Sequence, residues 1–283
     1  MPKLVETMID EWQLKPDGPP KHGYTSLVLP VLQDGVPAAL KLTVDGDDES
    51  EHEALALTHW AGRGAVRLLR ADPHRRVLLL ERLDSADLLS VPEGQAGEII
   101  GGLYRLLHRP ALPKLVPVSR YTERWLGALA ELSRDAPIPR RLVQQALSTG
   151  RELIDSEPVD EAVIVHGDLH YENVLAAERA DWLAIDPKPM AGDPHFEPAP
   201  MLWNRWACIV EAADVRGAIL GRLYTIVDAG GLDEHRARAW VLVRVVLNAH
   251  WTIQSAARSN RDLSAVDREA ITRYVTIAKA VNR

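Results

Sequence analysis

The chain has few of the residues and runs that would commit it to a disulfide-bonded, zinc-binding or membrane class. Its 283 residues contain one cysteine, Cys208, so neither an internal disulfide nor a cysteine-based zinc site can form. Cys208 lies in the apolar stretch MLWNRWACIV, which predicts a buried core thiol rather than a nucleophile. No apolar run approaches the roughly 20 residues that a membrane span needs. The N-terminus MPKLVETMIDEWQL does not resemble a signal peptide. We therefore expect a cytoplasmic protein that does not bind membranes.

The chain also lacks an excess of positive charge. Its formal net charge is −7 and its isoelectric point is about 5.8. Nucleic-acid binding requires a basic surface that neutralises phosphates, so a nucleic-acid partner is not expected. A neutral or cationic small molecule fits this charge better.

The apolar pattern divides the chain into a β-rich beginning and a mainly helical remainder. Two β-rich runs flank Asp34 and Gly35, and two more flank Asp72 and Pro73. Asp-Gly is a strong signal for a tight hairpin turn, so two hairpins are expected. Between them, residues 51–62 have the spacing of one short helix.

From about Asp84 onward, helical spacing dominates, and residues 199–282 predict three or four helical segments. No internal repeat is present, and no alternating βαβ units occur that would indicate a doubly wound sheet. A chain of this length usually forms more than one compact unit. The expected fold class is therefore α+β, with a small β-rich lobe over residues 1–83 and a larger helical lobe over residues 84–283.

The most informative stretch is VIVHGDLHYENVLAAERADWLAIDPKPM, residues 163–190. An apolar strand is expected to end at Asp168, and Asn173 follows five positions later. A predicted hairpin then returns Asp186 toward the same loop. Asp-x-x-x-x-Asn followed by a separate Asp after a strand is the arrangement of protein kinases. In that arrangement, the first Asp accepts the proton of the acceptor hydroxyl, while the Asn and the later Asp hold Mg²⁺.

Two other hypotheses fit parts of this stretch. His166, Asp168 and His170 could ligate the metal of a hydrolase, with Asp186 and His195 as further ligands. That hypothesis leaves Asn173 and the entire small lobe without a role, so we prefer His166 as a support of the loop. A non-catalytic binding protein of kinase-like fold is the second alternative, although retention of the costly polar residues argues against it.

The motif HGDLHYEN, residues 166–173, resembles the catalytic loop of the aminoglycoside phosphotransferase family. AIDPKPMAGDPHFEPAPMLWNRW is similar to its streptomycin 6-kinase and hydroxyurea kinase branch, as are TSLVLPVLQDGVPAALKL and GAVRLLRADPHRRVLLLERL. The resemblance extends over residues 20–280. It implies a bilobal protein-kinase-like fold, in which a nucleotide-binding lobe with one helix precedes a catalytic and substrate-binding lobe. It also implies ATP- and Mg²⁺-dependent phosphorylation of a hydroxyl on a streptomycin-like aminoglycoside, hydroxyurea or another small compound.

By this resemblance, Asp168 is the catalytic base, and Asn173 and Asp186 are the Mg²⁺ ligands. A lysine of the small lobe should hold the α- and β-phosphates of ATP, and Lys41 stands mid-strand among apolar neighbours. A buried ammonium needs a counter-charge. Among Glu49, Glu51 and Glu53, the resemblance favours Glu53, and the other two read as a solvated acidic face.

The loop that covers the phosphates has no standard motif. Neither G-x-x-x-x-G-K-[ST] nor G-x-G-x-x-G occurs, so this is not a P-loop protein. Gly23, Thr25 and Ser26 could offer hydroxyl and backbone N–H groups to phosphates, although an ordinary turn explains them almost as well. LLLERLD should connect the two lobes, where the backbone of Glu81 to Leu83 would meet adenine; a plain strand end explains the same residues.

The acceptor is expected in the large lobe, near Asp168. Carboxylates and indoles suit a cationic acceptor through ion pairs and cation–π contacts. The candidates are Asp193, Glu197, Trp203, Trp206 and Asn204. The alternatives are that the two tryptophans form a core stripe on one helix and that Asp193 caps a loop. Lys188 could reach the γ-phosphate or lie on the surface.

Overall fold

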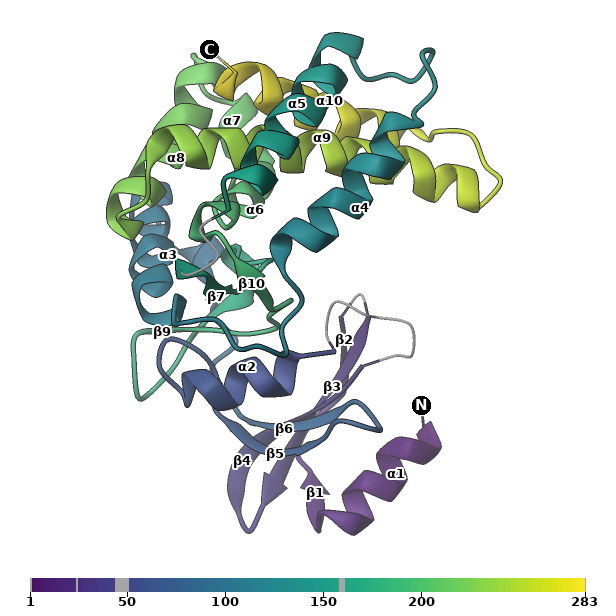
Figure 1. The fold of residues 1–283 in the computed structure, drawn as a ribbon. Coiled ribbons are helices and arrows are strands. Elements are labelled where there is room, and N and C mark those ends of the chain that lie inside the picture. The colour runs from purple at the N-terminus through teal and green to yellow at the C-terminus, as the bar shows by residue number, and fades with distance from the viewer. Residues whose placement is uncertain (1, 24, 44–50, 158–160, 283) are drawn as a thin grey trace. The chain divides into compact units, whose positions relative to one another are not determined.

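The chain forms two compact units in a computed structural model that describes every residue except 1, 24, 44–50, 158–160 and 283 (Figure 1). Unit 1 comprises Met1–Asp87 and Asn173–Pro189. Unit 2 comprises Leu88–Glu172 and Met190–Arg283. The division expected at residue 83/84 differs from these units in two respects: unit 1 continues to Asp87, and the segment 173–189 joins it.

Unit 1 is built on an antiparallel sheet with the strand order β1-β3-β4-β6-β5, and β2 pairs with β3. Its strands are β1 (Leu14–Pro16), β2 (Lys21–His22), β3 (Ser26–Gln33), β4 (Val36–Thr43), β5 (Leu68–Asp72) and β6 (Val77–Glu81). Both predicted hairpins are present, and Asp34 and Gly35 have φ values of 51° and 82°. Two positive φ values in succession are typical of the type I′ turn that matches the twist of a hairpin.

The alternation of side chains along β4 gives its two faces different roles. Leu40 and Leu42 point into a core that also contains Met8 and Trp12 of the N-terminal segment, whereas Lys41 belongs to the other face. Met8 lies on α1 (Pro2–Glu11), a helix of unit 1 that the sequence analysis did not expect. The described part of unit 1 therefore carries two α-helices, α1 and α2 (Glu53–Trp60), where one was expected.

The segment 173–189 contains the predicted hairpin, formed by β8 (Val174–Ala176) and β9 (Trp182–Ala184). Its attachment to unit 1 is made by backbone hydrogen bonds. Ala176 N donates to the carbonyl of Ala86, and Ala184 N donates to the carbonyl of Gly64. These bonds explain why unit 1 reaches Asp87 and includes the hairpin.

Unit 2 is mainly helical and surrounds the short antiparallel pair β7 (Val163–Val165) and β10 (Met190–Gly192). Its longer helices are α3 (Glu93–Leu107), α4 (Val118–Ala130), α5 (Arg140–Asp155), α8 (Val215–Gly230), α9 (Glu234–Arg258) and α10 (Ala265–Val281). Its short helical segments are η2 (Leu88–Ser90), η4 (Tyr171–Asn173, which crosses into unit 1), η5 (Pro194–Phe196), α6 (Ala199–Trp203) and α7 (Trp206–Val210). Residues 199–282 thus form five helices where three or four were expected.

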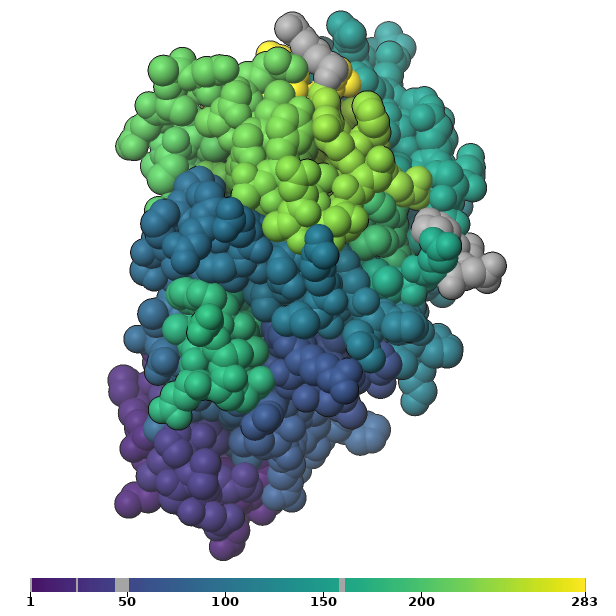
Figure 2. All heavy atoms as spheres, turned by 90° about the vertical axis from the view of Figure 1, so that its left-hand side faces the viewer, coloured from purple at the N-terminus to yellow at the C-terminus, as the bar shows by residue number. Residues whose placement is uncertain are grey.

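Helices α3 and α8 pack closely against each other, and Figure 2 shows them side by side on one face. The apolar core of unit 2 draws on α4, α5, α8, α9 and α10 and on β7. Within the described part of the chain, no helix is both long enough and apolar enough to cross a bilayer.

Candidate active site

A buried cluster of charges in unit 1 joins Lys41 of β4, Glu53 of α2 and Asp186, which follows β9. Lys41 Nζ lies 2.6 Å from Glu53 Oε2 and 2.5 Å from Asp186 Oδ1. Lys41 and Glu53 are only 4% and 2% exposed. The predicted pairing of Lys41 with Glu53 is therefore present. Glu51 is exposed, as expected of a solvated residue, and Glu49 lies outside the described residues.

Burial and pairing act in opposite directions on this cluster. Burial by itself would lower the pKa of Lys41, but the ion pairs with Glu53 and Asp186 raise it above its usual value. Burial raises the pKa of Glu53, and the Lys41 ammonium offsets only part of that effect. Lys41 is therefore held as a fixed positive charge.

Asp186 is positioned by the β8–β9 hairpin. Ile185 N donates to the carbonyl of Asn173 at 2.9 Å, which ties the residue before Asp186 to the predicted second metal ligand. Asp186 has a φ of 54°, a left-handed conformation that few non-glycine residues adopt and that often marks functional sites. Its side chain is 34% exposed and also lies 3.5 Å from Lys188 Nζ. Lys188 is thus partnered with Asp186 rather than free on the surface.

The donor atoms of Asn173 and Asp186 are of the kind that a Mg²⁺ site requires. Asn173 offers an amide oxygen and Asp186 a partly exposed carboxylate. Mg²⁺ prefers few oxygen ligands from protein and takes the remainder from phosphates and water.

The loop predicted to be catalytic follows β7 in unit 2. Gly167 has a φ of 83°, which favours glycine at that position. The next residue, Asp168, has a 38% exposed side chain, and its carboxylate lies 3.8 Å from His170 Nε2. The buried His166 accepts a hydrogen bond at Nδ1 from the backbone N–H of Asp168. His166 therefore supports the loop, as preferred from the sequence.

The metal-hydrolase hypothesis finds no support in this geometry. Across the described ranges, no group of three or more His, Cys, Asp or Glu side chains is placed to hold a metal ion. The Nδ1 atom of His166 accepts from the backbone N–H of Asp168.

Glu197 holds the same loop from inside unit 2. Its wholly buried carboxylate accepts hydrogen bonds from the backbone N–H groups of His166 and Gly167. His108 Nε2 lies 3.6 Å from Glu197 Oε1. Burial opposes ionisation, but the pairing with His108 and the loop N–H groups keep the pKa of Glu197 below its usual value. The geometry does not favour the predicted contact of Glu197 with the acceptor, because its oxygens are enclosed and already bonded.

Comparison with known proteins decides the family. The model of the aminoglycoside/hydroxyurea antibiotic resistance kinases matches residues 11–256. The chain belongs to this family. It is 41% identical to a streptomycin 6-kinase of Streptomyces glaucescens, over 96% of this chain and 87% of the relative. It is also 38% identical to a hydroxyurea phosphotransferase of Kitasatospora aureofaciens, over 99% of this chain and 80% of the relative. The protein is accordingly a kinase, a phosphotransferase with a small-molecule acceptor.

Solved structures with low sequence identity share the fold. A choline kinase of Streptococcus pneumoniae superposes with a TM-score of 0.66 at 14% identity, over 100% of this chain and 99% of that chain. A spectinomycin phosphotransferase in complex with ADP and spectinomycin superposes with a TM-score of 0.66 at 14% identity, over 99% of this chain and 98% of that chain. The predicted α+β, protein-kinase-like fold class is confirmed.

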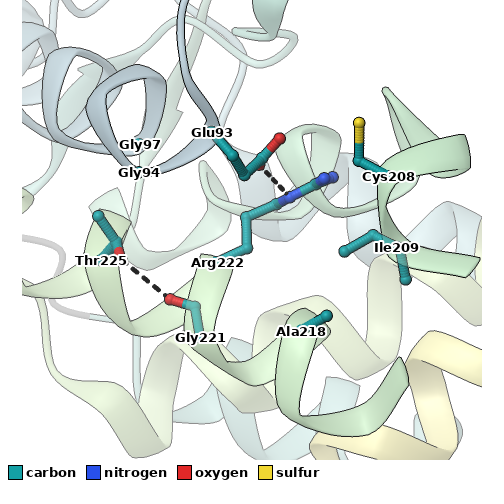
Figure 3. Close-up of a pocket in the computed structure, with 9 residues that line it drawn as sticks. All are labelled: Glu93, Gly94, Gly97, Cys208, Ile209, Ala218, Gly221, Arg222 and Thr225. Atoms are coloured by element: carbon teal, nitrogen blue, oxygen red, sulfur yellow. Dashed lines mark hydrogen bonds and ion pairs between the residues drawn. The ribbon is translucent and has the colours of Figure 1, made fainter. Parts of the chain in front are cut away.

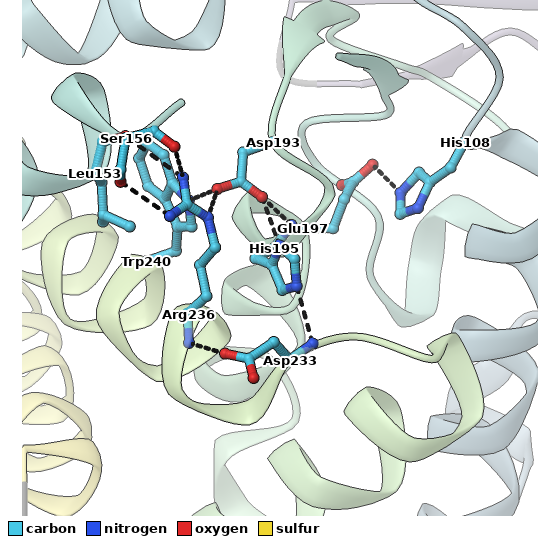
Figure 4. A network of polar contacts seen from close by, with 9 residues as sticks. All are labelled: His108, Leu153, Ser156, Asp193, His195, Glu197, Asp233, Arg236 and Trp240. Atoms are coloured by element: carbon cyan, nitrogen blue, oxygen red, sulfur yellow. Dashed lines mark hydrogen bonds and ion pairs between the residues drawn. The ribbon is translucent and has the colours of Figure 1, made fainter. Parts of the chain in front are cut away.

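In this family member, Asp193 has a structural role. Its wholly buried carboxylate accepts hydrogen bonds from His195 N, from Trp240 Nε1 and from Arg236 (Figure 4). It is the N-cap of the η5 segment, as the alternative interpretation held. The predicted contact with an acceptor is not supported, because these donors enclose the carboxylate.

The tryptophans and their neighbours also differ from expectation. Trp203 and Trp206 do not share a helix, because α6 ends at Trp203 and α7 begins at Trp206. Asn204 is the C-cap of α6, and its Nδ2 donates to the carbonyl of Pro200. Cys208, expected in the core, is exposed on α7. Trp203 and Trp206 are partly buried and pack against the apolar core of unit 2, so Cys208 alone of these residues is exposed.

The other residues that the sequence predicted to contact ATP lie on unit 1. Ser26 begins β3, and its carbonyl accepts from Gly23 N in a tight turn. The carboxylate of Glu81 pairs with Arg179 at the end of β6. Leu83 follows in the connecting segment, and its backbone N–H and C=O make no hydrogen bond to the described residues.

Sequence reasoning missed one residue that acts on the catalytic loop. Arg244 of α9 donates through Nη2 to the carbonyl of Gly167 at 2.8 Å and through Nη1 to that of Phe196. Its guanidinium also lies over the rings of Phe196 and Trp203. An arginine inside the apolar run WVLVRVVL, residues 240–247, was the available signal, but its partner could not be identified without the tertiary structure.

Proposed function

We propose that this kinase transfers the γ-phosphoryl group of ATP, in the presence of Mg²⁺, to a hydroxyl group of a small antibiotic-like acceptor. The observation that carries the proposal is the buried cluster of Lys41, Glu53 and Asp186. A lysine held by an acidic helix residue and placed beside a second carboxylate is the arrangement that positions nucleotide phosphates in kinase-like folds.

Each unit contributes its own residues to the reaction. On unit 1, Lys41 holds the α- and β-phosphates, Asn173 and Asp186 hold Mg²⁺, and Ser26 donates to a phosphate. The free backbone groups of Leu83, next to Glu81, are available to the edge of adenine. Bound Mg²⁺ neutralises charge on the phosphates. On unit 2, Asp168 orients the acceptor hydroxyl and accepts its proton as the oxygen bonds to the γ-phosphorus and ADP leaves.

The acceptor class follows from the curated relatives, whose names are streptomycin 6-kinase and hydroxyurea phosphotransferase. A streptomycin-like aminoglycoside is the first candidate. The burial of Asp193 and Glu197 favours hydroxyurea as a second candidate, because neither carboxylate is available to a cationic acceptor. Phosphorylation in the cytoplasm, where ATP is supplied, would inactivate either compound and confer resistance.

The test compares Asp168→Asn with Glu172→Gln, which removes an exposed carboxylate from the same loop. ADP release is followed with streptomycin, hydroxyurea and choline as acceptors. Asp168→Asn should lower kcat by about 10²- to 10⁴-fold with the KM for ATP little changed, since a general base is lost. Glu172→Gln should match the parent. A fully active, folded Asp168→Asn protein would refute the assignment, and absence of turnover with the first two acceptors would refute the acceptor class.

A further inference from the structure

Tyr171 lies within the catalytic loop, three residues after Asp168 and two before Asn173. Its side chain is wholly buried. Its hydroxyl donates a hydrogen bond to Glu93 Oε1. A buried phenol needs such a partner, but an apolar side chain would fill the same space without one. The choice of tyrosine therefore commits this loop to Glu93, the first residue of α3.

Glu93 in turn is held by arginines from two other helical segments. Arg222 Nε of α8 lies 2.5 Å from Glu93 Oε1, and Arg205 Nε lies 3.8 Å from Glu93 Oε2. The Arg222 side chain is only 1% exposed, and its Nη1 donates to the carbonyls of Met201 and Asn204. A guanidinium buried to this degree has few alternative positions, so it fixes the carboxylate that Tyr171 contacts.

The same two guanidinium groups also contact the tyrosine ring. Arg205 and Arg222 each lie 5.6 Å from the ring centroid of Tyr171. Cation–π contacts of this length attract a guanidinium to the face of an aromatic ring. The ring and the hydroxyl of Tyr171 are thus both restrained, the ring by the arginines and the hydroxyl by Glu93.

We propose that Tyr171, Glu93 and Arg222 form a clamp that positions the catalytic loop and thereby the carboxylate of Asp168. Tyr171 is a positioning residue, because it acts through the backbone of the loop. The inference rests on the proposed role of Asp168 as the base. It proposes that the contacts of Tyr171, three residues further along the chain, place the Asp168 carboxylate accurately for proton acceptance. Displacement of a catalytic group by about 1 Å can cost on the order of 100-fold in rate.

A cavity of about 240 Å³ lies beside the clamp and supplies both controls and a reporter (Figure 3). Glu93 and Arg222 line it, together with Gly94, Gly221 and Cys208. A Cβ atom at Gly94 or Gly221 would meet no atom within 4 Å. Alanine at either position therefore changes the chain next to the clamp without touching it. Cys208 is the one cysteine in the sequence, lines this cavity and is exposed, so the rate of its reaction with a thiol reagent reports on changes in its surroundings next to the clamp.

The test is Tyr171→Phe, which removes only the hydroxyl, alongside Gly94→Ala and Gly221→Ala. We expect Tyr171→Phe to lower kcat by about 10- to 100-fold. The KM for ATP should change less than about threefold, because the nucleotide residues lie on unit 1. The rate of Cys208 labelling and the melting temperature should remain near those of the parent, and both glycine variants should retain parental kcat.

A double variant identifies the partner. Glu93→Gln keeps an oxygen that can accept the hydrogen bond of Tyr171. It removes the negative charge through which Arg222 and Arg205 hold residue 93 in place. If the clamp acts as one unit, Tyr171→Phe combined with Glu93→Gln should lose no more activity than the worse single variant. Parental kcat in Tyr171→Phe overturns the clamp. A loss of kcat matched by faster Cys208 labelling and a lower melting temperature overturns it as well, because the hydroxyl would then serve only stability. If Asp168→Asn is inactive while Tyr171→Phe is not, the clamp fails and the proposed function stands.

Discussion

The position of Lys41 is determined by the strand that carries it and by two acidic partners. The strand supplies the burial, α2 supplies Glu53, and the hairpin segment supplies Asp186. The ammonium therefore remains in place before any phosphate arrives, and less reorganisation is needed when the nucleotide binds.

Replacing Glu53 by Gln should impair nucleotide handling more than it impairs folding. Burial raises the pKa of Glu53, so a neutral side chain of the same size avoids part of the desolvation cost. Lys41 would then be held by Asp186 alone. We expect kcat/KM for ATP to fall about 10-fold, the effect of losing one charge-assisted contact of about 1.5 kcal/mol.

Glu51→Gln is the matched control, because Glu51 lies two residues earlier and is exposed. Steady-state kinetics and thermal unfolding of both variants measure the two effects separately. An unchanged kcat/KM in Glu53→Gln would contradict the role of Glu53 in orienting Lys41.

Among the secondary-structure elements, α3 and α8 depend on small residues where they cross. A Cβ at Gly101 would lie 2.5 Å from Ala229 Cβ and 2.7 Å from Gly230 N. At the next residue, Gly102, a Cβ would meet nothing within 4 Å. Glu93 of the clamp is the first residue of α3, so the packing of α3 against α8 also affects the position of Glu93.

Alanine substitutions at these two neighbours should have opposite effects on stability. Gly102→Ala should stabilise by about 0.5–1 kcal/mol, because alanine loses less backbone freedom in a helix. Gly101→Ala gains the same helical preference but should destabilise by about 1–3 kcal/mol through overpacking. Urea unfolding of both proteins compares them directly. Similar midpoints would show that α8 does not restrict α3 at Gly101.

In the molecule as a whole, Asp193 links the segment after β10 to more distant parts of unit 2. Arg236 and Trp240 of α9 both donate to its carboxylate, and Arg236 also donates to the carbonyl of Ser156 after α5. Burial opposes ionisation, but hydrogen bonds from His195 and Trp240 lower the pKa of Asp193 to about 2.

The stability of unit 2 should therefore fall in acid. A carboxyl group whose pKa is lower in the folded state stabilises the fold above its unfolded pKa of about 3.9. That contribution disappears as the pH falls through about 2, and it amounts to about 2–3 kcal/mol. Asp193→Asn should lose this stability at pH 7 and show a shallower decline between pH 5 and 2. Urea unfolding at several pH values measures both slopes, and parallel curves would contradict the assignment.

Features set by neighbouring residues could be predicted from the sequence. The hairpin turn at Asp34 and Gly35, the strand before His166 and the hairpin before Asp186 all follow from turn chemistry and apolar alternation, which act over a few residues. The need of Lys41 for a counter-charge could also be predicted, because it stands in an apolar strand, whereas the choice of Glu53 as its partner came from the resemblance to the family. Helix α1 could have been found as well, since Leu4, Val5, Met8, Ile9 and Trp12 recur at helical spacing.

The sequence by itself therefore determined the secondary structure around the motif HGDLHYEN and the residue types that this loop carries, because turn chemistry and apolar alternation act over a few residues. Only the tertiary structure decided which carboxylates remain available. Asp193 and Glu197 lie in an acidic, aromatic stretch that suggested an acceptor site, yet both are enclosed by donors from distant parts of the chain, α9 for Asp193 and the loop after β7 for Glu197. The partner of Tyr171 could not be predicted from the sequence either, because Glu93 is 78 residues away in the chain. Burial and long-range pairing depend on how helices pack, and no local pattern encodes that arrangement.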